Sequence, residues 1–448
     1  MTGGGARALF AVAAMLARGT SRAERRRRRL LTSCAALATF FLLGAVNLLL
    51  IRGTFPTRWA GLVAEEGLRP GTALALVLLV VPVLALLHQA GRVAQATQER
   101  RLAALRLAGA TPKDVRMLGA VEAVRVGTAG AIIGGIAYVS GQQAAMAALG
   151  VLNTARYAIP PWPVPLVLAL VVGAAVTVSL RVSRHVVTSP LSVSRRASRP
   201  RPAPYTLIPL ALGVLVMVVG TLTRELDKVG VPLFFLGGVL TVAGVAVGSS
   251  RLILESARLA ARRARSPETL LAARALEADP RAGGRTMAVV GLVVAFGTGT
   301  GAIEWDVRQN GDIEGFWRVS LGLTYLAVLF ALAVAVTALV VHRAESLLEG
   351  GRSMAALAAA GVPVGALRRA ALRQTLIAAF PICVIAAVAA LIGMTPGIFT
   401  DPSLPMVAWT SGRALLMVAI AVASAAAVTA LSGRLLARAA SPDRLRAE

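Results

Sequence analysis

Charged residues are scarce in this chain of 448 residues: Asp, Glu, Lys and Arg make up 15% of the sequence, against roughly 25% in an ordinary soluble domain. Hydrophobic residues reach 56%, and the mean hydropathy is +0.73. A composition this apolar excludes a soluble globular protein. The sequence instead predicts an all-α, polytopic membrane protein.

Lysine and cysteine are also nearly absent. Lys113 and Lys228 are the only lysines, so almost all of the net charge of +26 comes from arginine. A basic protein can bind nucleic acid, but these arginines gather in loops where membrane topology requires positive charge, and we expect no nucleic-acid partner. Cys34 and Cys383 lie in apolar runs, which excludes a disulfide framework and a cysteine metal motif.

A phosphate-binding loop is missing as well. Such a loop needs Gly-x-x-x-x-Gly-Lys followed by Ser or Thr, and neither lysine has that context. The chain therefore lacks an ATPase site of its own. No nucleophile, carboxylate or histidine constellation indicates another enzyme, so we predict no catalytic residue, no metal site and no cofactor bound by this chain.

Ten apolar runs are present, each close to the length of about 20 residues that a helix needs to cross a hydrocarbon core of about 30 Å. The predicted spans are residues 30–51, 71–87, 124–140, 164–180, 206–222, 231–253, 287–303, 319–341, 375–392 and 414–431.

The loops between these spans alternate in charge. Arginine crowds residues 181–201 and 258–285, whereas the intervening loops carry few or balanced charges. The positive-inside rule then places both termini in the cytoplasm. The tryptophans agree, because indole rings favour the membrane interface and all five lie in or beside loops assigned to the outside: Trp59, Trp162, Trp305, Trp317 and Trp409.

Small residues recur at helical spacing inside the spans, as in Gly130 with Gly134, Gly244 with Gly248, and Gly297 with Gly301. Such pairs allow membrane helices to approach closely. The outer loops at 52–70 and 304–318 are too short for folded domains. We expect the second to be a solvated acidic loop containing Glu304, Asp306, Asp312 and Glu314.

A break in an amphipathic helix stands out at residues 100–122, which we call the first elbow. An apolar stripe bordered by Arg106 runs up to Gly109, which suits the left-handed cap that ends a helix. Thr111 can cap the next helix, Pro112 suits its first position, and Asp114 lies near its positive end. Arg116 and Glu122 follow, where the helix enters the third span.

The same plan returns 252 positions later, at residues 352–374, which we call the second elbow. Gly361 corresponds to Gly109, Arg368 to Arg116 and Gln374 to Glu122, while Pro363 lies one position nearer its glycine than Pro112 does. The repeat predicts three parts: a four-span half at 1–190, a linker with a central pair of spans at 191–254, and a second four-span half at 255–448.

The order of helix, glycine, turn, helix and span, present twice, resembles the cytoplasmic signature of FtsX-like permeases, the membrane subunits of MacB-type ABC transporters. The resemblance is carried by Arg106, Gly109, Ala110, Arg116 and Glu122. It implies that a cytoplasmic ABC ATPase docks on residues 111–121 and 362–372, one copy at each elbow, and that ATP acts only through this partner. It also implies that the coupling residues are Arg106, Gly109, Thr111, Pro112, Asp114, Arg116, Glu122, Gly361, Pro363, Arg368 and Gln374.

Two functions remain open under this resemblance. The first is the permease subunit of an ATP-driven transporter that exports or extracts an amphipathic substrate, such as an antimicrobial peptide, an antibiotic or a lipid. The alternative is a non-transporting subunit that transmits ATPase motion to an extracellular partner. Anything handled outside would be met by the short loops, by a separate accessory protein or within the bilayer. The Arg-rich, Ala-rich composition is typical of a GC-rich bacterial genome, so we expect a bacterial cell membrane.

Overall fold

The computed structural model describes residues 22–51, 69–93, 112–148, 157–187, 202–223, 227–309, 315–349, 351–395 and 403–433. Within these ranges every regular element is a helix, which confirms the predicted all-α class. The chain divides into two compact units: unit 1, Met1–Ala197, and unit 2, Ser198–Glu448. The predicted three-part division stays a prediction, and the central pair of helices packs with the second half inside unit 2.

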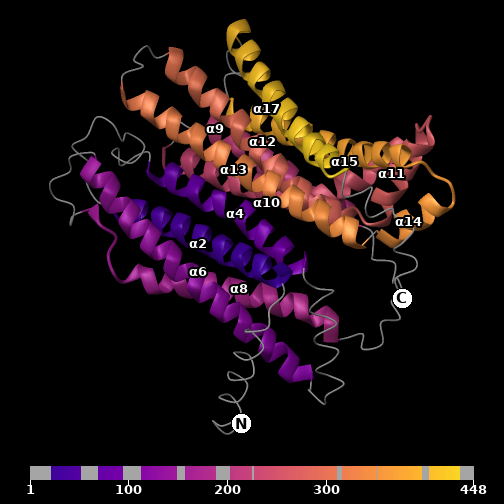
Figure 1. The fold of residues 1–448 in the computed structure, drawn as a ribbon. Coiled ribbons are helices and arrows are strands. Elements are labelled where there is room, and N and C mark those ends of the chain that lie inside the picture. The colour runs from indigo at the N-terminus through magenta and orange to yellow at the C-terminus, as the bar shows by residue number, and fades with distance from the viewer. Residues whose placement is uncertain are drawn as a thin grey trace. The chain divides into compact units, whose positions relative to one another are not determined.

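In its described part, unit 1 is a bundle of helices that run alongside one another (Figure 1): α2 (Arg22–Leu50), α4 (Arg69–Val93), α6 (Pro112–Ala148) and α8 (Pro163–Val187). Helix α2 contacts the other three. Two glycines allow α6 to approach it closely, since a Cβ added at Gly134 would lie 2.2 Å from the Ala36 carbonyl oxygen and one at Gly130 would lie 2.5 Å from that of Thr32. The predicted pairing role of these glycines is confirmed.

Unit 2 begins with a short 3-10 turn and continues through a longer series of helices (Figure 1). Its elements are η1 (Pro204–Leu207), α9 (Ile208–Leu222), α10 (Asp227–Arg262), α11 (Pro267–Ala278), α12 (Pro280–Gln309), α13 (Gly315–Glu349), α14 (Gly351–Ala359), α15 (Val364–Met394) and α17 (Leu404–Leu431).

Helix α12 forms the core of unit 2 and contacts α10, α13, α15 and α17. Residues 286–294 of this helix are all buried, which is typical of a helix surrounded by other helices rather than one with a lipid-facing side. The other predicted glycine pairs lie at helix contacts here. A Cβ at Gly244 would lie 2.3 Å from the Leu210 backbone, and one at Gly297 would lie 2.4 Å from the Met417 sulfur.

In the described residues, nine helices are long and apolar enough to cross a membrane, and they overlap nine of the ten predicted spans. The remaining prediction, 71–87, lies in the 25-residue helix α4, whose apolar part Arg69–Leu84 is shorter. The chain is therefore a multi-pass membrane protein.

The expectation of a solvated loop beginning at Glu304 is wrong. Helix α12 continues to Gln309, and Glu304 is a buried residue within it. The reason is a local ion pair: Arg308 lies one helical turn further and binds Glu304 at 2.8 Å, which supports an extra turn and a half of helix.

The helices of unit 2 begin and end at two places, which we call the elbow end and the far end. The elbow end holds α11, α14, the start of α15 and the end of α17. The far end holds the end of α12, the start of α13, the end of α15 and the start of α17.

Candidate functional site

The structure describes only part of the first elbow. Arg106, Gly109 and Thr111 lie outside the described residues. Pro112 is the first residue of α6, which agrees with the predicted helix start. Asp114 and Arg116 follow in the opening turns of α6, and Glu122 lies further along the same helix with its side chain half-buried.

The second elbow is described throughout its turn. Helix α14 ends at Ala359, and Gly361 has φ +90°, the only positive φ in the described residues. The Gly361 N–H donates to Ala358 O at 3.0 Å, and the Val362 N–H donates to Leu357 O at 3.0 Å. These two bonds form a Schellman motif, in which a left-handed residue satisfies the last carbonyls of a helix. Glycine is favoured there because it has no Cβ.

Apolar contacts brace this turn. Leu347 of α13 and Leu367 of α15 are both buried and form a small cluster. Leu357 and Val362, on either side of the turn, pack against it, as the hydrophobic contact of a Schellman motif requires. Pro363 then caps α15 with an extended backbone, φ −66° and ψ 140°. The second elbow is therefore a fixed corner between α13, α14 and α15.

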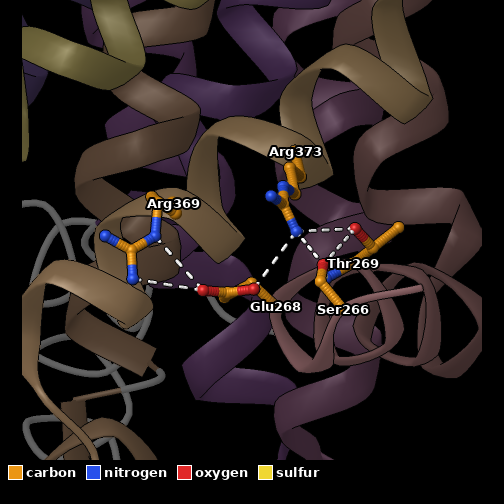
Figure 2. Close-up of polar contacts among 5 residues, drawn as sticks. All are labelled: Ser266, Glu268, Thr269, Arg369 and Arg373. Atoms are coloured by element: carbon orange, nitrogen blue, oxygen red, sulfur yellow. Dashed lines mark hydrogen bonds and ion pairs between the residues drawn. The ribbon is translucent and has the colours of Figure 1, made fainter. Parts of the chain in front are cut away.

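A group of polar side chains, which we call the clasp, joins the start of α15 to α11 (Figure 2). It consists of Ser266, Glu268, Thr269, Arg369 and Arg373. Arg369 binds Glu268 Oε1 at 3.2 Å, and Arg373 binds Glu268 Oε2 at 3.2 Å, so one carboxylate holds two arginines that are four residues apart. Arg373 also donates to Thr269 Oγ1 at 2.8 Å and to the Ser266 hydroxyl. Ser266 is the N-cap of α11 and accepts from the Thr269 N–H at 3.4 Å.

The surroundings of Glu268 favour its ionised form. Its pKa is lowered from the usual 4.5, first because the carboxylate accepts a hydrogen bond from its own backbone N–H. Desolvation opposes this effect and raises the pKa, whereas hydrogen bonds from Arg369 and Ser266 and the charge of Arg373 lower it further. The position in the first turn of α11 adds the favourable end of the helix dipole.

Further contacts connect the second elbow to α17. Arg368, a predicted coupling residue, is exposed and donates to Ala430 O at 3.4 Å, near the end of α17. Arg343 of α13 donates to Ala371 O at 3.0 Å and to Thr429 Oγ1 at 3.3 Å, and it also binds the Thr375 hydroxyl. Helices α13, α15 and α17 therefore meet one guanidinium just beyond the elbow.

Sequence reasoning found the corner but missed the clasp. The bounds of α11 agree with its residue types, with Ser266 as N-cap, Pro267 in the first position, and Asp279 and Pro280 directly after its end. The sequence does not, however, pair Glu268 with Arg369 and Arg373, which lie 101 and 105 residues away. Gln374, the last predicted coupling residue, is half-buried on α15.

Comparison with known proteins gives one family match. The FtsX-like permease C-terminal model matches residues 72–191, which include most of α4, the first elbow, α6 and α8. No curated protein and no solved structure matches the chain. Residues 72–191, which carry the first elbow within a multi-pass helical chain, are therefore similar to the C-terminal domain of FtsX-like permeases.

Proposed function

We propose that this chain is the permease subunit of an ATP-driven ABC transporter, and that it couples a separate cytoplasmic ATPase to export or extraction of an amphipathic substrate. Each elbow receives one ATPase subunit, so a single chain binds two. Both termini and both elbows lie on the cytoplasmic side of a bacterial cell membrane. ATP is bound by the partner and not by this chain.

The second elbow carries this proposal. Gly361, Pro363, Val364 and Arg368 are exposed, so the corner presents a surface to a partner. The corner is nevertheless fixed, by the Schellman bonds and by the packing of Val362 on Leu347 and Leu367. An ATPase can transmit its motion only through a contact surface that is both exposed and rigid.

Side-chain contacts connect the second elbow with the other helices of unit 2. The clasp links α15 to α11, and Arg343 links it to α13 and α17. Helix α15 itself has 31 residues, so it extends about 46 Å at 1.5 Å per residue and reaches across a hydrocarbon core of about 30 Å. Closure of an ATPase pair would then tilt α15 against its neighbours as a rigid rod.

Reconstitution of the chain with the ATPase encoded beside its gene tests the proposal. The expected result is a stable complex with two ATPase subunits per chain, whose ATP hydrolysis moves a labelled amphiphile between vesicle leaflets or out of them. Stimulated hydrolysis without any movement would favour the signalling alternative. Failure of the ATPase to bind the chain would contradict the proposal.

A further inference from the structure

The far end of unit 2 contains an ion network that the elbow mechanism does not use. Glu304 of α12, 8% exposed, accepts from Arg308 at 2.8 Å, pairs with Arg413 of α17 at 3.6 Å and accepts from the Tyr325 hydroxyl of α13. Arg413 also donates to the Tyr325 oxygen at 3.0 Å. The Arg308 guanidinium lies 4.3 Å from the centre of the Trp409 ring. We call these five residues the outer cluster.

The outer cluster has more positive charge than its described members neutralise. One carboxylate, Glu304, faces two guanidinium groups, and Tyr325 is neutral. The Arg413 side chain is only 18% exposed, so water solvates its charge weakly. Among the cluster's described residues one positive charge therefore remains uncompensated.

Unpartnered hydrogen-bond donors gather at the same end. Buried side-chain atoms without a partner in the described residues are Arg413 Nε, Trp409 Nε1, Thr298 Oγ1, Thr395 Oγ1 and, in unit 1, Asn47 Oδ1. Arg413 and Trp409 lie one turn apart on α17. Thr298 and Thr395 belong to neighbouring stretches, because a Cβ at Gly299 would lie 2.2 Å from the Met394 sulfur and one at Gly301 would lie 3.0 Å from Arg413 Cβ.

The hydrogen-bonding capacity of these atoms indicates which kind of group could bind them. Indole and guanidinium nitrogens can only donate, and a threonine hydroxyl can donate. Leaving such groups buried and unpaired is unfavourable, so these donors indicate an acceptor beyond the described residues. With an uncompensated positive charge beside them, that acceptor is best matched by an anion with several oxygens.

We infer that the outer cluster binds the phosphate or carboxylate group of an anionic amphiphile, and that Arg308, which covers the site, turns away from Trp409 to donate a hydrogen bond to that group. The Arg308 side chain is 49% exposed and lies over Trp409, so rotation of this one side chain uncovers the indole N–H and the guanidinium behind it. This assignment deepens the proposed function, on which it rests, by giving the amphipathic substrate an anionic headgroup.

The binding test uses the purified chain in a neutral detergent without any ATPase, so it can fail independently of the coupling experiment. Trp409 serves as the reporter in a variant whose other tryptophans are changed to Phe, namely Trp59, Trp162, Trp305 and Trp317. Dodecyl phosphate, inorganic phosphate and dodecyltrimethylammonium are titrated separately. We expect a saturable change in Trp409 emission with dodecyl phosphate and none with the ammonium amphiphile.

Single substitutions then locate the site. Arg308→Gln should weaken dodecyl phosphate binding about tenfold, the loss expected for one charged hydrogen bond. The matched control is Arg274→Gln at the elbow end, an exposed arginine that also pairs with a glutamate in its own helix, and it should bind as the unsubstituted protein does. Trp409→Phe, followed by thermal shift, removes one donor while keeping the ring and should also weaken binding.

The probes separate the two sources of such an anion. Saturation by dodecyl phosphate alone supports the site and assigns it to an amphiphile headgroup, whereas saturation by inorganic phosphate as well supports the site with a free anion as ligand. An equal response to the ammonium amphiphile, no saturation by either phosphate, or unchanged binding in Arg308→Gln would overturn the inference and leave the outer cluster a purely structural ion network.

Discussion

Replacing Gly361 by Val should open the end of α14 without disturbing the packing around it. A Cβ at Gly361 would meet no atom within 4 Å, so the position has open space beside the backbone. The penalty comes from the backbone, because φ is +90°. A left-handed conformation costs an L-residue roughly 1–2 kcal/mol, and a β-branched residue rarely adopts it at all.

Amide hydrogen exchange measures this penalty directly. The N–H groups of Gly361 and Val362 close the Schellman motif, so they exchange when the corner opens. A loss of about 1–2 kcal/mol of local stability corresponds to roughly 5–30-fold faster exchange. Mass spectrometry of a peptide that covers residues 354–364 in the purified protein would detect that change.

Two control variants separate backbone strain from side-chain bulk. Gly361→Asn should exchange more slowly than Gly361→Val, because Asn tolerates the left-handed region. Gly365→Ala adds a methyl group within α15 that meets only Arg369 Nη1, at 3.8 Å, and should leave exchange unchanged or slower. Wild-type exchange in Gly361→Val, or equal exchange in the Asn and Val variants, would refute the reasoning.

Gly134→Ala should lower the unfolding temperature, because the added Cβ would lie 2.2 Å from the Ala36 carbonyl oxygen and such overpacking costs roughly 1–3 kcal/mol. Gly173→Ala, whose Cβ would meet nothing within 4 Å, should leave it unchanged or slightly higher. Because the pKa of Glu268 is lowered from 4.5, the clasp should be complete above pH 4.5 and should weaken as the pH falls below it. The distance between spin labels on α11 and α15 should therefore increase only in acid, and Glu268→Gln should remove this pH dependence. Arg343→Met should leave the unfolding temperature unchanged or raise it, because its described partners are neutral oxygens and removal of a buried charge relieves desolvation.

Local features of this protein were predictable from sequence. A span is recognised from its own hydropathy, and the glycine pairs at 130 and 134 or 297 and 301 are recognised from their spacing. The corner at Gly361 was predictable because a single residue type determines whether the chain can take a left-handed turn. Each of these depends on residues close together in the chain.

Contacts between distant helices were not predictable. Glu268 could have been paired with any of many arginines, and only the packing of α11 on α15 selects Arg369 and Arg373. Glu304 was misread because its charge suggested solvent, while Tyr325 and Arg413, 21 and 109 residues later, bury it. The i, i+4 spacing of Glu304 with Arg308 was the one sequence signal that the helix continues.

Cysteine cross-linking between the second elbow and the ATPase partner tests the central proposal most directly. The native Cys34 and Cys383 are buried, so a cysteine at the exposed Val364 would react selectively. Val364→Cys should cross-link to the ATPase in membranes, whereas Leu404→Cys, exposed at the far end, should not. A cross-link from Leu404→Cys with none from Val364→Cys, or labelling of Val364→Cys from outside the cell, would contradict the proposal that the elbow receives the motor.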